Sequence, residues 1–326
     1  MAMSLEQFLS EWESDSLYIE LKTSGSTGEP KRMLVEKRRM LNSARITCDF
    51  LGLHKGDTAL LCMSLDYIAG KMMVVRSIER GLKLIVQEPS GHPMVGIQRG
   101  QSHSIDFAAM VPMQVYNSLQ VPEERECLMQ IKHLIIGGGA IDDALAAELK
   151  TFPNAVWSTY GMTETLSHIA LRRLSGPKAS EWYTPFSSVR VSLSDEGCLI
   201  IDAPEVCPEI LITNDIADLS PQGFRILGRK DNVICSGGLK LQAEEIEREL
   251  KPFLRVPYLI SKRPDEKFGD VVVLLTEGSV EEAREVCQRV LPKYHQPRAY
   301  LHIDHIPLTE TSKPARKTAE LLVKKR

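Results

Sequence analysis

Residues suited to phosphate chemistry occur at widely separated positions of this chain. Residues 23–31 read TSGSTGEPK, a run of hydroxyls and glycines that ends in a lysine, just after a strand-like stretch at 17–21. Glycines allow a tight turn against a polyphosphate, hydroxyls and backbone N–H groups donate to its oxygens, and lysine supplies positive charge. The run does not satisfy the G-x-x-x-x-G-K-[ST] pattern of a Walker A loop. By itself it also fits a flexible surface turn.

A second polar run, STYGMTET, occupies residues 158–165. Tyr160 offers an aromatic face for a base, Thr163 a hydroxyl for a phosphoryl oxygen, and Glu164 a carboxylate for a hard cation. The alternative is a polar turn before a helix, with Thr163 and Glu164 as capping residues. Upstream, residues 137–140 (GGGA) alone indicate a turn between a strand and a helix.

Three charged side chains in the last third of the chain complete the candidates. Asp215 lies in a TND triplet, Arg229 opens the run RKDNVICSGGLKLQAEEIE, and Lys313 lies in PLTETSKPAR at 307–316. A carboxylate and a rigid guanidinium suit the vicinal hydroxyls of a sugar, and a lysine can stabilise charge that develops during a reaction. Each could equally be an ordinary surface charge.

The segments around these residues predict the elements that position them. Apolar runs at 58–63, 82–86 and 131–136 predict buried strands, and helices are predicted at 68–80 and 142–150, the second capped by Asp142 and Asp143. Strands that alternate with helices favour a mostly parallel α/β sheet.

The pattern changes near residue 197. Short strands with turn signals occupy 198–234, a charged helix is predicted at 242–250, and strands at 271–275 and 299–303 bracket a helix at 280–290. This pattern predicts a small α+β domain after a linker near 228–232.

Composition narrows the function classes. The chain has 326 residues, a net charge of −3 and a pI of about 6.3, so it has no general attraction for nucleic acid or anionic membranes. The N-terminus lacks a signal-peptide pattern, and no apolar run is long enough to span a bilayer. Its seven cysteines include no C-x-x-C pair, which argues against a disulfide framework or a zinc site. We expect a cytoplasmic protein with small-molecule partners, without nucleic-acid binding or membrane insertion; its oligomeric state, a homodimer included, stays open.

Taken in order, the motifs resemble the signatures of the adenylate-forming superfamily, which contains acyl-CoA synthetases, luciferases and peptide-synthetase adenylation domains. Residues 23–31 resemble its phosphate-binding signature, 160–164 its Y-G-x-T-E core, and 307–316 its P-x-T-x-[ST]-G-K-x-x-R signature. The resemblance implies an α/β fold: an N-terminal AMP-binding domain (1–228) with a parallel or mixed sheet and packed helices, a hinge (229–232), and a small mobile α+β domain (233–326). Because the phosphate run begins at Thr23, we expect a shortened form of this fold.

The resemblance also assigns roles and implies ATP, Mg²⁺ and coenzyme A as ligands. Lys313, Thr163 and Glu164 would be catalytic, with Glu164 also holding Mg²⁺. Asp231 would be the hinge, and Gly237, Gly238 and Lys240 would serve the thiol half-reaction. The implied ATP- and AMP-binding residues are Thr23, Ser24, Gly25, Ser26, Thr27, Gly28, Lys31, Gly138, Gly139, Ala140, Tyr160, Gly161, Asp215 and Arg229.

Four stretches, at 67–84, 88–93, 107–120 and 160–174, resemble the o-succinylbenzoate–CoA ligases of menaquinone biosynthesis. That substrate carries two carboxylates, so one should meet a cation while the other reacts; Lys71, His168 and Arg172 are the candidates, although each could be an ordinary surface or helix-face residue. Alternatives are a CoA ligase for another aryl or aliphatic acid, or a non-catalytic nucleotide-binding relative. The chain departs from the family pattern at Ser312 and Pro314, which flank Lys313, and in residues 63–71, which lack a common histidine.

Overall fold

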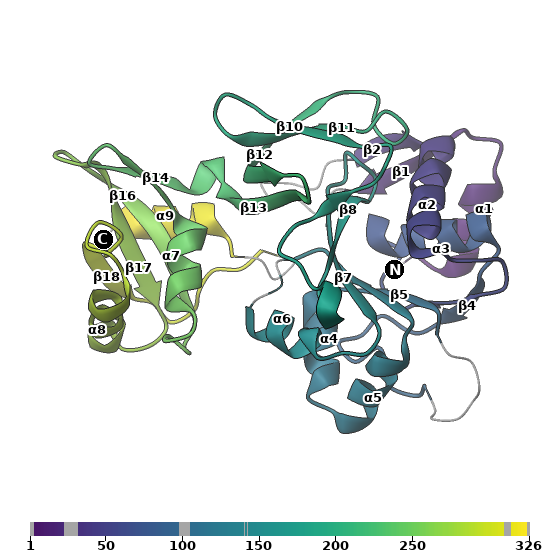
Figure 1. Cartoon of the computed structure of the whole chain (residues 1–326), viewed down its shortest axis with the longest axis horizontal. Helices are drawn as coiled ribbons and strands as arrows, with labels where there is room; N and C mark the ends of the chain where they lie inside the picture. Colours follow the sequence, from purple (N-terminus) through teal and green to yellow (C-terminus); the bar gives the residue numbers. More distant parts are fainter. Residues whose placement is uncertain are drawn as a thin grey trace. The chain divides into compact units, whose positions relative to one another are not determined.

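The computed structural model describes residues 3–22, 32–97, 105–139, 141, 143–309 and 314–324 (Figure 1). The chain divides into two compact units. Unit 1 comprises Met1–Val191, Ile201–Leu211 and Leu219–Arg225, and unit 2 comprises Ser192–Ile200, Ile212–Asp218 and Ile226–Arg326. No helix in the described part of the chain is long and apolar enough to cross a membrane.

Unit 1 is built on a sheet with the strand order β4-β3-β5-β6-β7-β8-β9 among its described residues. The pairs from β4 through β7 are parallel, and β8 and β9 continue the sheet antiparallel. Every residue of β3 and β5 is buried, as expected for central parallel strands covered on both faces. The strands are β3 (Thr58–Leu61), β4 (Lys83–Val86), β5 (Phe107–Met110), β6 (His133–Ile136), β7 (Ala155–Gly161), β8 (His168–Arg173) and β9 (Thr184–Pro185).

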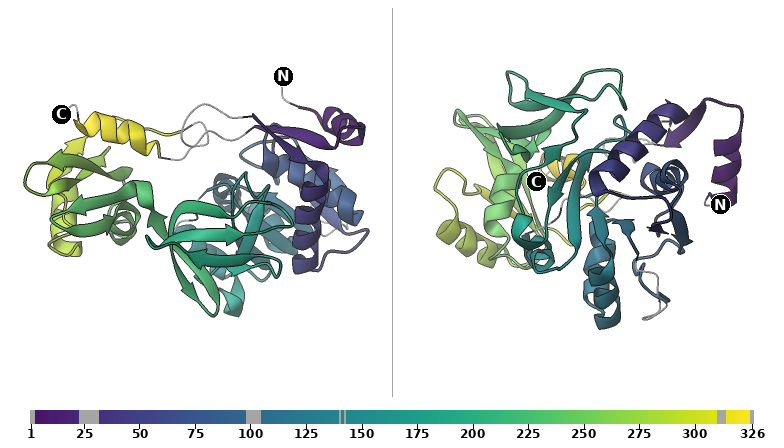
Figure 2. Two further views of the ribbon diagram at one scale, coloured as in Figure 1. Left: turned by 90° about the horizontal axis from the view of Figure 1, so that it is seen from above. Right: turned by 45° about the vertical axis from the view of Figure 1, so that its right-hand side comes forward.

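Helices cover the two faces of this sheet. Figures 1 and 2 show α2 and α3 together on one side and α4, α5 and α6 on the other. Alternate strand residues such as Leu60, Ala108 and Leu134 form one apolar cluster with Val115 of α4 and Leu149 of α6, because successive side chains of a strand point to opposite faces. The helices are α2 (Lys37–Leu51), α3 (Ile68–Arg80), α4 (Pro112–Leu119), α5 (Pro122–Gln130) and α6 (Asp143–Lys150).

Among the described residues, the remaining elements before residue 230 are two helices, a two-stranded sheet and a four-stranded sheet. Helix α1 (Leu5–Glu13) begins with a capping box in which Ser4 accepts from the backbone of Gln7. Strands β1 (Tyr18–Lys22) and β2 (Arg32–Glu36) pair antiparallel. A short 3₁₀ helix, η1 (Gly176–Lys178), follows β8. A further sheet has the strand order β10-β11-β12-β13; its strands are β10 (Arg190–Leu193), β11 (Cys198–Asp202), β12 (Leu211–Ser220) and β13 (Gly223–Arg229).

Unit 2 has its own sheet, in which β17 pairs with β14 and β16 antiparallel and with β18 parallel. One face of the sheet packs on α7 and α8, and the other packs on α9, in two separate apolar clusters. The elements are η2 (Lys230–Asn232), β14 (Val233–Ser236), β15 (Leu239–Gln242), α7 (Ala243–Leu250), β16 (Tyr258–Asp265), β17 (Gly269–Thr276), α8 (Val280–Val290), β18 (Ala299–His302) and α9 (Arg316–Lys324).

The predicted fold class is confirmed: unit 1 is α/β with a mostly parallel sheet, and the later part is α+β. Helices α3 and α8 begin and end at the predicted residues. The strand predicted at 58–63 was too long, because it ends at Leu61, and the helix predicted from 142 begins at Asp143; residue 142 lies outside the described residues. The alternative of a helix after Thr163 and Glu164 was wrong, since strand β8 follows them. The predicted domain boundaries and hinge stay a prediction.

Candidate active site

The STYGMTET run lies at the carboxyl end of β7 in the parallel sheet of unit 1. Strand β7 ends at Gly161, and a turn leads directly into β8. A Cβ atom at Gly161 would collide with the backbone of Ser167 and His168, so this position requires glycine. Within the turn, Thr163 is half-buried and Glu164 is exposed. Ligands of open α/β sheets bind at the carboxyl ends of strands, which is where these two side chains lie.

The turn after Gly161 is held in a strained conformation. The buried Thr165 hydroxyl accepts from the backbone N–H of Met162 at 3.1 Å and lies 2.7 Å from the carbonyl oxygen of Ser167. Leu166 has a φ of 64°, a left-handed conformation that no other described non-glycine residue adopts. A branched side chain is rarely found there, and such strain concentrates at functional sites.

An aromatic cluster surrounds Tyr160. Its ring centroid lies 5.0 Å from that of Phe224 and 5.8 Å from that of Tyr183, and the rings of Tyr183 and Phe224 stack on each other. Tyr183 and Phe224 are joined by two backbone hydrogen bonds. Gly223 allows the two backbone segments to approach closely, because a Cβ atom at this position would collide with the carbonyl of Tyr183. Tyr160 therefore packs against this stacked pair of rings while remaining only half-buried, so part of its ring stays accessible for stacking on a planar base.

The glycine run after β6 lies beside the end of β7. Ile136 pairs with Ser158 in the parallel register, so residues 137–139 and the turn after Gly161 share one edge of the sheet. Gly138 has a φ of 80°, which favours glycine, and a Cβ at Gly137 would strike the hydroxyl of Thr159. Gly138 and Gly139 thus lie near the predicted nucleotide site; Ala140 is outside the described residues.

The predicted phosphate run and the predicted catalytic lysine also fall outside the described residues. Residues 23–31 connect Lys22 and Arg32, which are paired across β1 and β2. On either side of the undescribed residues 310–313, Leu308 and Pro314 form a β-bridge, and Ala315 N–H donates to the carbonyl of Pro307 at 2.7 Å. The contacts of Thr23, Ser24, Gly25, Ser26, Thr27, Gly28, Lys31 and Lys313 therefore stay predictions.

Unit 2 brings together the predicted ribose and hinge residues. Arg229 Nη1 lies 3.1 Å from Asp215 Oδ1, and its Nη2 lies 3.3 Å from Asp231 Oδ2. Asn214 also donates to Asp231, at 3.3 Å. Arg229 is nearly half-exposed, so the geometry leaves this guanidinium accessible between two carboxylates. Gly237 and Gly238 form the turn between β14 and β15 with positive φ angles, and Lys240 is exposed on β15.

The three predicted acyl-binding cations have protein contacts in unit 1. Lys71 is buried and donates to the carbonyl of Glu20 at 3.1 Å. Arg172 lies over the ring of Tyr183. Burial, reinforced by the charge of Arg76, lowers the pKa of His168 well below its usual value, so its ring is neutral at physiological pH. Their role toward an acid stays a prediction.

Sequence reasoning missed Arg76 of α3, which is 2% exposed. Its Nη2 donates to Ser167 Oγ at 2.8 Å, within the turn that follows Glu164. A sequence signal was present: Arg76 directly follows the apolar run 72–75 within the helix predicted at 68–80. A charged residue is rarely buried without a partner, so an arginine at the end of an apolar helical run indicates a specific polar contact in the interior.

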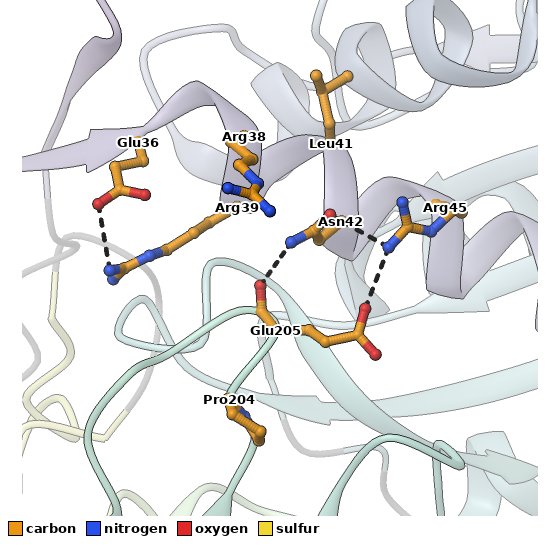
Figure 3. Close-up of a pocket in the computed structure, with 8 residues that line it drawn as sticks. All are labelled: Glu36, Arg38, Arg39, Leu41, Asn42, Arg45, Pro204 and Glu205. Carbon is orange, nitrogen blue, oxygen red and sulfur yellow. Dashed lines mark hydrogen bonds and ion pairs between the residues drawn. The ribbon is translucent and has the colours of Figure 1, made fainter.

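A groove of about 680 Å³ is a further feature that sequence reasoning missed (Figure 3). Asn42 donates to the carbonyl of Glu205, and Arg45 pairs with the carboxylate of Glu205 at 3.1 Å, which ties the segment 201–211 to α2. Arg39 pairs with Glu36, so the carboxylates in the groove already neutralise two of its arginines. None of the predicted site residues is among the described residues that line the groove: Glu36, Arg38, Arg39, Leu41, Asn42, Arg45, Pro204 and Glu205.

Residues 6–212, more than half of the chain, match the family described as AMP-binding enzyme. The chain therefore belongs to the AMP-binding enzyme family, the class of ATP-dependent, AMP-forming carboxylate–CoA ligases and their relatives. The site at the carboxyl edge of the unit 1 sheet agrees with this membership.

The comparisons with individual proteins are more specific. The 2-succinylbenzoate–CoA ligase of Enterococcus faecalis is 25% identical over 97% of this chain and 71% of that protein. A solved acyl-CoA synthetase (AMP-forming)/AMP-acid ligase II-like protein from Dyadobacter fermentans is 32% identical, with a TM-score of 0.65, and covers 97% of this chain and 92% of that chain. O-succinylbenzoate coenzyme A synthetase from Bacillus subtilis, solved with ATP and magnesium, shares the fold at a TM-score of 0.77 and 22% identity, over 91% of this chain and 68% of that chain.

Proposed function

We propose that this enzyme adenylates o-succinylbenzoate with ATP and transfers the acyl group to coenzyme A, a step of menaquinone biosynthesis. The observation that carries the proposal is the end of β7 and the turn after it, where Tyr160 in the strand is followed by Thr163 and Glu164 in the turn, at the carboxyl edge of the sheet. The similarity to 2-succinylbenzoate–CoA ligases over nearly the whole chain supports the choice of acid.

In the first half-reaction, a carboxylate oxygen of the acid attacks the α-phosphorus of ATP and displaces pyrophosphate, which leaves an acyl-AMP. Tyr160 stacks on the adenine, Thr163 donates to the α-phosphate, and Asp215 and Arg229 bind the ribose hydroxyls. The segment 23–31 holds the departing phosphates, and Lys313 balances the charge that develops at phosphorus. Glu164, whose carboxylate is exposed, would hold a Mg²⁺ ion that shields the phosphate charges.

In the second half-reaction, the sulfur of coenzyme A attacks the acyl carbonyl carbon and AMP leaves. We propose that the smaller domain moves about Asp231 between the two half-reactions and presents Gly237, Gly238 and Lys240 to the thiol. Arg229 contacts both the predicted hinge residue Asp231 and the predicted ribose-binding Asp215. A change of backbone conformation at the hinge would therefore also change the contacts of Arg229 with the ribose.

The decisive experiment measures coenzyme A-dependent AMP formation with ATP, Mg²⁺ and a panel of acids: o-succinylbenzoate, benzoate and a fatty acid. Turnover confined to o-succinylbenzoate supports the whole proposal. Turnover confined to another acid retains the two-step chemistry and discards the substrate and pathway. ATP binding without turnover of any acid refutes the enzymatic proposal and favours a non-catalytic nucleotide-binding relative.

A metal-specific control accompanies this assay. Glu164→Gln keeps the size of the side chain and removes its charge, so we expect a higher Mg²⁺ concentration for half-maximal AMP formation. Glu20→Gln, a carboxylate on β1 that pairs with Arg32, is a matched charge change outside the predicted site. An unchanged Mg²⁺ requirement in Glu164→Gln would remove Glu164 from the metal site.

A further inference from the structure

The strand order of the unit 1 sheet reverses between β3 and β5. Strand β4 follows β3 in the chain and lies on one side of it, whereas β5 follows β4 and lies on the other side of β3. Helix α3, which follows β3, and helix α4, which follows β5, lie on opposite faces of the sheet (Figures 1 and 2). In open α/β sheets, ligands bind outside the carboxyl ends of the strands at such a reversal. The carboxyl ends of β3 and β5 therefore qualify as a ligand position on the same sheet edge as the turn after β7.

Strands β3 and β5 separate early at this edge. Their pairing ends at Leu60 and Ala108, although β5 continues to Met110. On its other side β5 stays paired with β6 as far as Met110 and Ile136. The backbone groups where β3 and β5 part need other partners, because buried backbone groups are almost always hydrogen-bonded.

Gln114 of α4 bridges the strand ends at this place. Its Nε2 donates to the carbonyl of Cys62, directly after β3, at 3.1 Å and to the carbonyl of Ser90, after β4, at 2.9 Å. Its Oε1 accepts from the backbone N–H of Val111, directly after β5, at 3.1 Å. Two carbonyl acceptors and one N–H donor fit a single orientation of the amide, and the side chain is only 4% exposed. One buried side chain thus fixes the relative positions of the chain after three neighbouring strands.

The segment after β4 is also held along α4 and α5. Asn117 donates to the carbonyl of Gly91 at 3.2 Å, and Nδ1 of His92 lies 2.8 Å from Oε1 of Glu124, which is 5% exposed. Together with the bond from Gln114, three consecutive residues of this segment each have a partner on one of the two helices. The segment is therefore a fixed part of the sheet edge.

The bridged strand ends adjoin the glycine run of the candidate active site. A Cβ atom on Gly138 would lie 3.5 Å from Cγ1 of Val111, and one on Gly139 would lie 3.5 Å from Cγ of Pro112. The residues after β5 and after β6 are thus in close contact, and β7, whose turn carries the predicted catalytic residues, is the next strand of the sheet. A group bound over the ends of β3 and β5 lies beside the predicted nucleotide position, as an acid that attacks the α-phosphorus must.

We propose that Gln114 is a positioning residue for the acid, because it holds the chain after β3, β4 and β5 in the arrangement that receives the acid and itself touches neither substrate. A buried amide suits this role, since it fixes backbone groups without adding a charge. The inference rests on the proposed function for the chemistry, acid adenylation, but not for the identity of the acid. Gln114 bridges the ends of β3, β4 and β5 and not those of β6 and β7, so its loss affects the acid and spares the nucleotide.

The test compares Gln114→Met with Gln120→Met, the same substitution at an exposed amide that donates to the carbonyl of Tyr116 in its own helix. In Gln114→Met we expect the KM for o-succinylbenzoate to rise roughly tenfold or more, because a misplacement of about 1 Å in a site can cost up to about 10²-fold. The KM for ATP and the dissociation constant for AMP should stay near those of the wild type. Gln120→Met should leave all three constants unchanged.

A second variant keeps the test decisive if Gln114→Met folds poorly. Gln114→Glu retains the acceptor for the Val111 N–H at the start of α4, but an ionised carboxylate cannot donate to the carbonyls of Cys62 and Ser90. We expect the same selective rise in the KM for the acid. An unchanged KM for the acid in both variants, or equal rises in the KM for the acid and for ATP, would overturn the proposal in favour of a purely structural role.

Failure of the proposed function shows separately. If the wild type turns over another acid of the panel, the same comparison is made with that acid. If it turns over none, calorimetric titration of o-succinylbenzoate into the enzyme with ATP and Mg²⁺ measures acid binding directly. Weaker binding in Gln114→Met than in the wild type then supports the proposal, whereas equal binding, or no binding to the wild type, overturns it.

Discussion

Arg316 and Glu247 form a two-point ion pair in unit 2, with Nη2–Oε2 and Nη1–Oε1 distances of 2.7 and 3.0 Å. Arg316 is the first residue of α9 and follows the segment that contains Lys313. Glu247 lies on α7 and also accepts from the backbone N–H of Ile260 at 2.9 Å. The pair therefore anchors the start of α9 to α7 in unit 2.

Breaking this pair should destabilise unit 2. Arg316→Met leaves the largely buried Glu247 without its cation, and we expect a loss of about 2 kcal/mol in the free energy of unfolding. This loss is smaller than the one expected for a fully buried ion pair, because both side chains keep some exposure to solvent. Chemical denaturation measures it. The double variant Arg316→Met/Glu247→Leu should recover part of the loss, and strictly additive effects would show that the two residues are not coupled.

Lys313→Ala should abolish most of the adenylation step. We expect ATP–pyrophosphate exchange to fall by roughly 10²- to 10³-fold, because a cation aimed at developing charge acts mainly in the transition state. The thermal midpoint should not change. Lys317→Ala, an exposed lysine on α9, is the matched control and should retain exchange. Retained exchange in Lys313→Ala, or its loss in Lys317→Ala, would transfer the role to another residue.

Gly161→Ala should damage both stability and activity. The added Cβ would meet the backbone of Ser167 and His168, which cannot move aside as a flexible side chain could, so we expect a loss of about 1–3 kcal/mol together with slower adenylation. Gly139→Ala is a control for stability only, since its Cβ would make ordinary contacts with Pro112. Equal stability of the two variants would show that the turn after β7 can relax.

Stability should fall in mildly acidic solution because of His168. Burial lowers the pKa of His168 in the folded protein, whereas the unfolded chain binds a proton near pH 6.5. The unfolded state therefore holds more protons below about pH 6.5, and the free energy of unfolding falls with decreasing pH by at most about 1.4 kcal/mol per pH unit for this group. His133, whose pKa is also lowered mainly by burial, acts in the same direction.

The measurement is chemical denaturation of wild-type and His168→Gln protein between pH 5 and 7.5. The slope of stability against pH should be smaller in the variant and should not vanish, because His133 remains. Identical slopes would mean that His168 takes up its proton in the folded state as easily as in the unfolded chain.

Much of the fold was predictable from the sequence, because it depends on local order, whereas the roles of the predicted site residues stay a prediction. Apolar runs that alternate with helical periodicity predicted the α/β sheet, and α3 was predicted to the residue. The glycine and hydroxyl residues at 160–164 indicated a turn, because the backbone of a tight turn limits which residue types can occupy it. The same reasoning left strand ends uncertain by one or two residues, as at Leu61, where neighbouring strands decide how far pairing extends.

The contacts between distant residues were decided only by the tertiary structure. Phe224 packs against Tyr160, and Ser167 meets Arg76, because strand register and helix packing bring together residues that no local pattern connects. Sequence position alone suggested His168 as a cation, whereas burial beside Arg76 makes it neutral. Sequence by itself determined which chemical groups this protein carries and in which order, but charge state and partnership depend on solvent exclusion and three-dimensional proximity, which only the folded chain provides.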